Sequence, residues 1–205
     1  MRDRSSRIAT PGVLTKPVAS FVGGHIALDF CNTAGEHLAE QPDEMLLDWE
    51  SFIRWAVQTG LIRAEAYSPL LRHAAPINEI VDLREAIYKT GLAVARGERP
   101  SATDLLAMRT QANASKPPVA NGRGHLCWQP EPAQASEQLR AILAHEALSL
   151  FCSPRSLRIG ICEGGKCGWL FLDESRGKRR RWCDMKDCGN KAKARRYYEQ
   201  QHKNK

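Results

Sequence analysis

Four cysteines near the C-terminus constrain this 205-residue chain more than any other feature. They form two Cys-x4-Cys pairs, and they are Cys162, Cys167, Cys183 and Cys188. Zinc is commonly bound by two such short-range pairs, which the intervening chain folds into one tetrahedral set of thiolates. The glycines of Glu163-Gly164-Gly165-Lys166 favour a tight knuckle between the first two ligands, because glycine accepts positive φ. The spacing therefore predicts one structural Zn²⁺ per chain, held by all four cysteines.

The other cysteines and the N-terminal sequence argue against a disulfide framework. The chain has seven cysteines, an odd number, and its first 17 residues lack the apolar stretch of a secretory signal. We therefore expect a cytoplasmic protein in which Cys31, Cys127 and Cys152 are small buried hydrophobic residues. Buried free thiols and a redox or iron–sulfur centre are the alternatives for the four-cysteine cluster. A closed site of four thiolates offers no position for a catalytic water, so metal-dependent hydrolysis is not expected.

Around the cysteines the sequence predicts a small finger over residues 155–203. Trp169–Leu172 and Arg180–Trp182 are expected to pair as two strands joined by a turn at 174–177. Residues 189–202 are good helix formers without a proline, and a thiolate in the first turn is favoured by the positive end of the helix dipole. Knuckle, hairpin and helix together make a treble-clef-like zinc finger.

The same region is strongly basic. Residues 155–205 contain eight arginines and seven lysines against six acids, a net charge of +9, so the rest of the chain carries −2 of the total +7. This asymmetry indicates that the C-terminal region binds a polyanion. The expected nucleic-acid contacts are Arg179, Arg180, Arg181, Lys191, Lys193, Arg195 and Arg196.

Two groups of side chains on the predicted helix have an alternative role. The long stems of Lys191 and Arg195 either reach phosphates or cover the metal cluster. Tyr197 and Tyr198 either pack on a neighbouring tryptophan or stack on bases, and packing is favoured.

The rest of the chain predicts a flexible segment over residues 1–19 and an α-rich domain over residues 20–153. Hydrophobic periodicity and capping residues predict helices from Asp43 to Gly60 and over residues 64–73, 76–96 and 132–152. A further helix is expected to begin at Ser101 and to run through Leu105, Leu106 and Met108. A β-hairpin is expected around Asn121-Gly122, with strands at 119–120 and 125–128. The predicted fold class is α+β, a predominantly α N-terminal domain with a small hairpin plus the C-terminal finger. No apolar run is long enough to cross a membrane.

Three polar residues of the N-terminal domain, Asn32, Thr33 and Arg84, are candidate contacts for a small ligand. The favoured alternative is structural: Asn32 and Thr33 cap a helix, and Arg84 pairs with an acid such as Asp29. No nucleophile with a recognisable base and no phosphate-binding glycine loop is present, so an enzyme is not expected.

Three segments of the basic region carry a family resemblance: Cys167–Asp173, Arg179–Cys183 and Cys188-Gly189-Asn190. They resemble the CGNR zinc finger of bacterial transcription regulators. Lys191 replaces the motif's final arginine, which keeps the positive charge but removes the planar guanidinium group and its paired donors. Upstream, Gly23–Thr33 and Leu83–Ile87 resemble the ABATE domain that usually precedes this finger. The resemblance covers about residues 20–198 and implies DNA binding by the finger and a sensory role for the domain before it.

These observations predict a transcription regulator that binds DNA through the finger and is associated with the nucleoid when bound. Its N-terminal domain is expected to sense a small-molecule effector or to mediate association. An RNA-binding or ribosome-associated zinc protein is the main alternative, since a basic treble clef serves either polymer. An enzyme with its active site in the N-terminal domain is a third possibility. The sequence does not predict an oligomeric state.

Overall fold

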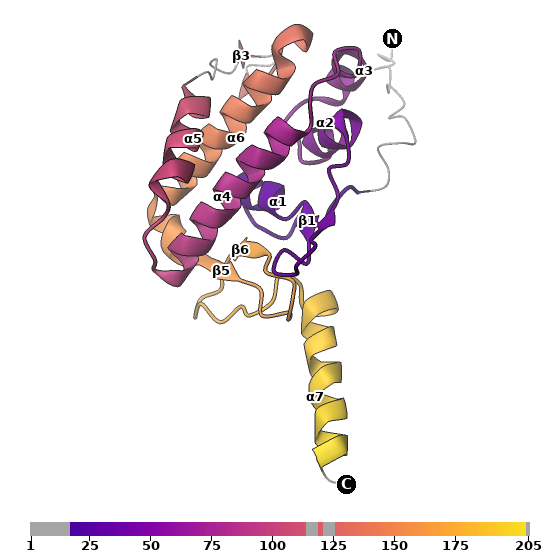
Figure 1. The fold of residues 1–205 in the computed structure, drawn as a ribbon, viewed down its shortest axis with the longest axis vertical. Helices are drawn as coiled ribbons and strands as arrows, with labels where there is room; N and C mark the ends of the chain where they lie inside the picture. Colours follow the sequence, from indigo (N-terminus) through magenta and orange to yellow (C-terminus); the bar gives the residue numbers. More distant parts are fainter. Residues whose placement is uncertain (1–16, 114–118, 121–125, 204–205) are drawn as a thin grey trace, which may run out of the picture.

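The computed structural model describes residues 17–113, 119–120 and 126–203. Its mostly helical N-terminal region, called the body from here on, consists of α1 (Ile26–Cys31), α2 (Trp49–Gln58), α3 (Tyr67–Leu71), α4 (Asn78–Arg96), α5 (Ala102–Ala112) and α6 (Ala135–Phe151). Short 3₁₀ turns are η2 (Ala64–Ala66), η3 (Pro132–Gln134) and η4 (Pro154–Arg158). Figure 1 shows α4, α5 and α6 side by side, with α1 beneath α4. The predicted fold class, a mostly helical region followed by a small finger-like region, is confirmed.

Three antiparallel hairpins accompany the helices. They pair β1 (Ala34–Gly35) with β2 (Asp43–Glu44), β3 (Val119–Ala120) with β4 (Leu126–Cys127), and β5 (Ile159–Ile161) with β6 (Leu170–Leu172). The predicted β3–β4 hairpin is confirmed in its pairing. Most of the predicted flexible segment, residues 1–16, lies outside the described residues. Ala19 is already buried, so the described chain is packed from close to its beginning.

Local capping fixes the helix ends, and one predicted end is wrong. Helix α5 begins after Ser101, whose side chain accepts from the Asp104 N–H as predicted. Helix α2 begins after Asp48, not after Asp43, because Asp48 and Ser51 form a reciprocal capping box. Asp43 lies instead in β2, opposite Gly35. The pairing of β1 with β2 thus removes residues 43–47 from the helix that their hydrophobic spacing predicts.

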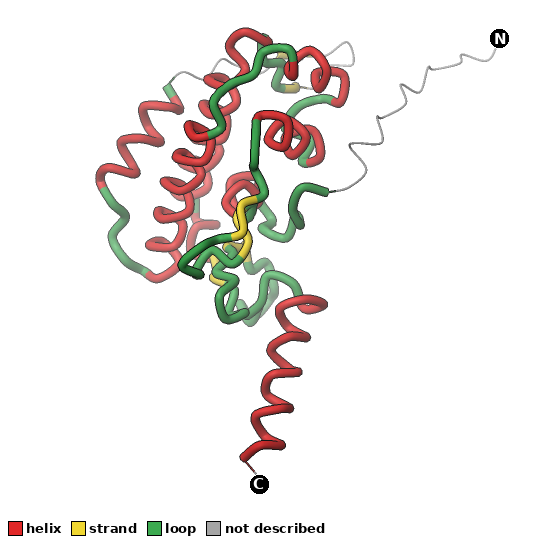
Figure 2. Tube along the Cα trace, turned by 45° about the vertical axis from the view of Figure 1, so that its right-hand side comes forward, coloured by secondary structure: helices red, strands yellow, loops and turns green. Residues whose placement is uncertain are grey.

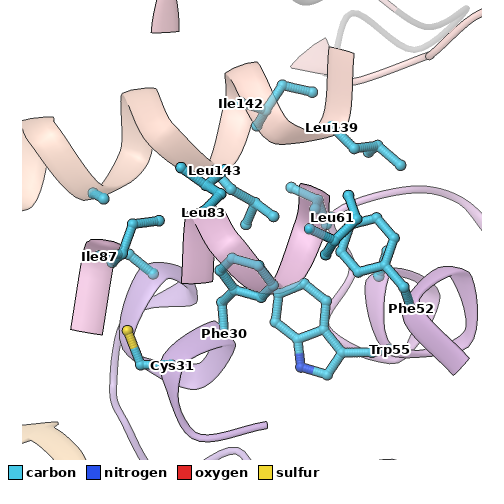
Figure 3. Close-up of a cluster of buried hydrophobic side chains, with 14 of the residues drawn as sticks. Phe30, Cys31, Phe52, Trp55, Leu61, Leu83, Ile87, Leu139, Ile142 and Leu143 are labelled. Atoms are coloured by element: carbon cyan, nitrogen blue, oxygen red, sulfur yellow. The ribbon is translucent and has the colours of Figure 1, made fainter. Parts of the chain in front are cut away.

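The core lies between α1, α2, α4 and α6, and aromatic side chains fill its centre. Figure 3 shows the rings of Phe30 and Trp55 side by side, below Leu83 of α4 and Leu143 of α6. Their ring centroids are 5.3 Å apart, and both residues have no exposed surface. Cys31 is also fully buried, as expected, whereas Cys152 is exposed, so the prediction that Cys152 is buried is wrong. The side chain of Cys127 lies outside the described residues.

The β5–β6 hairpin belongs to the same core as the body helices. Ile159, Leu170 and Leu172 are buried in the cluster that contains Leu28 and Ile87. The predicted partner of Trp169–Leu172 was therefore wrong: Leu170 pairs with Ile161, and residues 180–182 form no strand. Figure 1 shows β5 and β6 directly beneath α1 and α4.

The chain ends in a helix that stands away from all the others. A π-helical turn, η5 (Met185–Gly189), leads into α7 (Asn190–Lys203). In both views α7 projects from the cysteine-rich region, with no other element alongside it (Figures 1 and 2). Within the described residues, no helix combines the length and the apolar character needed to span a bilayer.

Candidate metal centre and nucleic-acid surface

The structure brings the four predicted ligands together. The sulfur atoms of Cys162, Cys167, Cys183 and Cys188 all lie within 4.8 Å of one another. The Sγ–Sγ distance is 3.8 Å for Cys167 and Cys183, and 3.6 Å for Cys183 and Cys188. A tetrahedron with zinc–sulfur bonds of about 2.3 Å has sulfur–sulfur edges of about 3.8 Å. The cluster therefore has the size of a tetrahedral zinc site, and its all-thiolate donor set suits that ion.

The first ligand pair lies on a knuckle that only glycine can complete. A Cβ on Gly164 would lie 2.8 Å from the Cys188 sulfur, so a larger residue would push this ligand out of the cluster. Gly168 has a φ of +65°, and a Cβ there would lie 2.5 Å from a carbon of Leu38. The second glycine thus lets the body approach the backbone of the knuckle closely.

The crowded thiols compete for protons. The pKa of Cys162 is lowered to about 2 because the Cys167 and Cys183 thiols donate hydrogen bonds to it. The pKa of Cys167 is raised to about 12, chiefly because its proton is held in the hydrogen bond to Cys162. The pKa of Cys183 is raised for the same reason. A metal ion that binds all four sulfurs must displace these protons, so binding releases protons to solvent.

Both parts of the chain match known families. Residues 158–201 match the model of the CGNR zinc finger. Residues 24–154, well over half of the chain, match the ABATE model, which is described as a putative stress-induced transcription regulator. The chain belongs to the ABATE family. A search of curated proteins gave no match. The resemblance seen in the sequence is thereby confirmed for both parts, and the ABATE description is that of a regulator, not of an enzyme.

In this ABATE protein the four-cysteine cluster is consistent with one zinc site in the CGNR finger. Cys183 precedes η5, whereas Cys188 lies within it, two residues before the start of α7. The Asp184 side chain accepts from the Lys186 N–H and caps that turn. Formation of the cluster therefore fixes where α7 starts and in which direction it leaves the finger.

Arg180, which the sequence assigns to phosphate contact, is bonded inside the finger. Its guanidinium lies 4.3 Å from the centre of the Phe171 ring. It donates to four backbone carbonyl oxygens, those of Val22, Leu172, Trp182 and Cys183. These bonds tie the N-terminal segment, β6 and the second ligand pair to one side chain. Arg180 therefore holds the finger together, with four of its five guanidinium N–H donors bonded to backbone carbonyls.

The other predicted cations differ in how far they are engaged. Lys191 forms an exposed pair with Asp187 at 2.9 Å, and the Arg195 guanidinium lies against Gly165 of the knuckle. Both side chains line the groove between the knuckle and the body. Arg181 pairs with Glu163, but both side chains are about half exposed, and such surface pairs are weak. The remaining three, Arg179, Lys193 and Arg196, are exposed and form no ion pair within the described residues.

Asn32 is not free to contact a ligand, because it joins the ABATE region to the finger. It has no exposed surface, and its side-chain amide donates to the Leu170 carbonyl at 2.9 Å. The Leu170 N–H donates back to the Asn32 Oδ1 at 3.0 Å. Thr33, also buried, donates to the Phe30 carbonyl at the end of α1. The sequence favours helix capping by both residues; the Thr33 hydroxyl bonds to the last turn of α1, whereas the Asn32 side chain bonds to β6 instead.

Arg84 is buried in an ion-pair network behind the β1–β2 hairpin. It donates to both carboxylate oxygens of Glu44 at 2.7 Å and pairs with Glu85 at 3.0 Å. Burial acts to raise the pKa of Glu44, but the hydrogen bonds and charge of Arg84 outweigh it, so the pKa is lowered. The predicted partner was wrong, since Asp29 instead accepts from the Gly23 N–H.

The sequence did not indicate the body residues that hydrogen-bond to the knuckle. The His37 ring stacks on Tyr88 with centroids 3.5 Å apart, and its Nε2 lies 3.2 Å from the Glu85 carboxylate. The backbone N–H of His37 donates to the Cys167 carbonyl, and the Tyr88 hydroxyl donates to the Gly168 carbonyl. No spacing in the sequence marks His37, whereas Tyr88 directly follows a segment that resembles the ABATE domain. The body therefore holds the first ligand pair by its backbone.

Proposed function

We propose that this protein is a DNA-binding transcription regulator. One structural Zn²⁺ bound by the four cysteines folds the finger, and α7 presents basic side chains to DNA. The family matches support a regulatory role, and the spacing of the four sulfurs supports the metal. Zinc in such a closed site supplies folding energy and no catalytic chemistry.

The conformation of α7 is the observation that carries the proposal. All its side chains described by the structure are exposed except that of Ala192, which is half-buried. An isolated helix of this length is only marginally stable in water, and most helices are stabilised by packing an apolar face. α7 has no such face, and its five lysines and arginines outnumber its single acid, Glu199. A polyanion is the partner that both its charge and its lack of apolar surface favour.

The proposed phosphate contacts are fewer than the seven that the sequence predicts. Arg180 is bonded internally, and Lys191 and Arg195 line the groove that faces the body. Four cations remain available, and they are Arg179, Arg181, Lys193 and Arg196. Arg181 belongs to this set because phosphate can replace the exposed carboxylate of Glu163 at little cost.

A small-molecule effector remains part of the proposal, at a different place from the one predicted. A groove of about 900 Å³ separates the β1–β2 hairpin from the knuckle and the start of α7. Glu36, Asp43 and Met45 line it on the body side, and Lys166 and Arg195 on the finger side. A ligand in this groove would touch both parts of the molecule and would lie next to Cys167, Cys183 and Cys188, which also line it.

The decisive experiment is a salt titration of binding with the full, zinc-loaded chain. Fluorescence anisotropy with random duplex DNA is expected to give a log K that falls with log[salt] at a slope of about −3.6, for four neutralised phosphates at about −0.9 each. Parallel titrations with single-stranded and double-stranded RNA test the alternative. Tighter binding to RNA than to DNA at every salt concentration would favour the RNA-binding protein and contradict the proposal.

A further inference from the structure

The two sides of α7 differ in what surrounds them. At about 100° per residue, Lys191 and Glu199 lie within about 40° of Arg195 on the helical wheel. This side faces the finger: these three residues, together with Arg196 at its edge, line a cavity of about 270 Å³ against Glu163 and Trp182. Lys191 and Arg195 also line the larger groove that faces the body.

The groove next to this side of α7 is unfavourable for phosphates. Its carboxylates are Glu36 and Asp43 on the body and Asp187 on η5. Zn²⁺ with four thiolates adds a net charge of −2, and the charge of the metal centre belongs in any electrostatic account of such a site. Lys166, Lys191 and Arg195 offset part of this negative charge. The lining of the groove therefore has a net negative charge, which would repel the phosphates of DNA that approached from the body side.

The opposite side of α7 is open and carries a different set of side chains. Lys193, Tyr197 and Gln200 lie about 140° to 160° from Arg195 on the helical wheel. All three are exposed, and none of the cavities described above includes them. Lysine and glutamine are side chains that hydrogen-bond to guanine and adenine edges in the major groove. Tyrosine adds a hydroxyl and a flat apolar ring.

The spacing of these residues matches the spacing of bases. From Lys193 to Gln200 the helix rises about 10 Å, at about 1.5 Å per residue. Base pairs are stacked about 3.4 Å apart, so this side spans about three of them. Arg196 lies to one flank of this side, about 100° from Arg195, where it can reach the phosphate backbone. We propose that Lys193, Tyr197 and Gln200 form the base-reading face of α7, inserted in the major groove. This rests on the proposed DNA-binding function. Lys193, counted above among the cations that meet phosphates on random DNA, contacts a base instead on a preferred sequence.

The chain offers two matched pairs for the test. Tyr197 and Tyr198 are adjacent and almost equally exposed, at 61% and 64%, but only Tyr197 lies on the proposed face. Lys193 and Lys191 have the same charge and lie on opposite sides of the helix. The variants Tyr197→Ala, Tyr198→Ala, Lys193→Ala and Lys191→Ala are compared in the full, zinc-loaded chain. Helical circular dichroism and zinc content confirm that each variant is folded.

The measurement uses a preferred duplex, selected from a random pool by the wild-type chain, and a scrambled duplex of equal length. Tyr197→Ala and Lys193→Ala are each expected to lose about 5- to 150-fold in affinity for the preferred duplex, the effect of one good base contact. On the scrambled duplex Tyr197→Ala is expected to bind like the wild type. Tyr198→Ala and Lys191→Ala are expected to keep the ratio between the two duplexes.

The outcomes separate the two proposals. The assignment of this face is overturned if both members of a pair lose the preference for the selected duplex equally. It is also overturned if Tyr197→Ala and Lys193→Ala keep that preference. In either case DNA binding stands. Selection of no preferred sequence by a wild-type chain that binds duplex DNA also overturns base reading alone. A wild-type chain that binds no duplex overturns the proposed function, and the base-reading face with it.

Discussion

Replacing Asn32 by alanine tests whether the body and the finger form one cooperative unit. The change leaves both the N–H and the carbonyl of Leu170 without their partner in a site that has no exposed surface. Each unsatisfied buried group costs about 1 to 3 kcal/mol, so we expect a loss of about 4 kcal/mol. In a chain of this size that lowers the Tm by about 8 to 16 °C.

Thermal unfolding followed by circular dichroism measures the loss of stability. The rate of zinc transfer to a chelator measures whether the change also affects the metal centre. Because Leu170 lies between the two ligand pairs, Asn32→Ala is expected to release zinc faster than the wild type. Asn78→Ala, an exposed residue at the start of α4, is the control and should change stability by less than about 0.5 kcal/mol. A Tm within about 2 °C of the wild type, or an unchanged rate of zinc release, would refute the reasoning.

Three further predictions concern the metal, the arginines and acid stability. Metal analysis should find one zinc per chain in the wild type and in Cys31→Ser, and a loss of zinc in Cys183→Ser; full occupancy in the last would disprove the ligand set. Arg196→Ala should flatten the salt slope of DNA binding by about one unit. Arg180→Ala should instead lower the Tm and hasten zinc release, and an unaltered Tm would contradict its internal role. Glu44 has a lowered pKa in the folded protein, so its contribution to stability is present above the ordinary value of 4.5 and is lost as pH falls through the folded value. The stability gap between wild type and Glu44→Gln, measured by urea unfolding, should therefore shrink from about pH 6 to about pH 3, and a constant gap would exclude this origin.

The metal cluster was predictable because its signal is local. Two ligands five residues apart, with glycines between the first pair, require no knowledge of the distant chain. The same holds for the start of α5, where Ser101 and Asp104 interact over three residues. In both cases the interacting residues are at most five positions apart, so the interaction can be recognised from the local sequence alone.

The hairpin partner and the role of Arg180 were not predictable for the opposite reason. Arg179, Arg180 and Arg181 are consecutive and chemically identical, and only tertiary structure directs the middle one inward over Phe171. Ile159–Ile161 pairs with β6 because both strands bury side chains against α1 and α4, a surface that forms only in the folded body. A three-residue strand has too few alternations to reveal its partner. Ile159–Ile161 and residues 180–182 are equally plausible partners for β6 in the sequence, and only packing against the folded body distinguishes them.

The hydrogen bonds between Asn32 and Leu170 join residues 138 positions apart, which has a consequence during protein synthesis. At about 5 to 20 residues per second, a nascent chain carries Asn32 for about 7 to 30 s before Leu170 is made. Throughout that interval the first-made half of the protein lacks the strand that closes its core. A chain truncated before Ile159 would lack the finger and also the β5–β6 side chains that complete the body core. We therefore expect such a chain to be less stable than the body of the full protein.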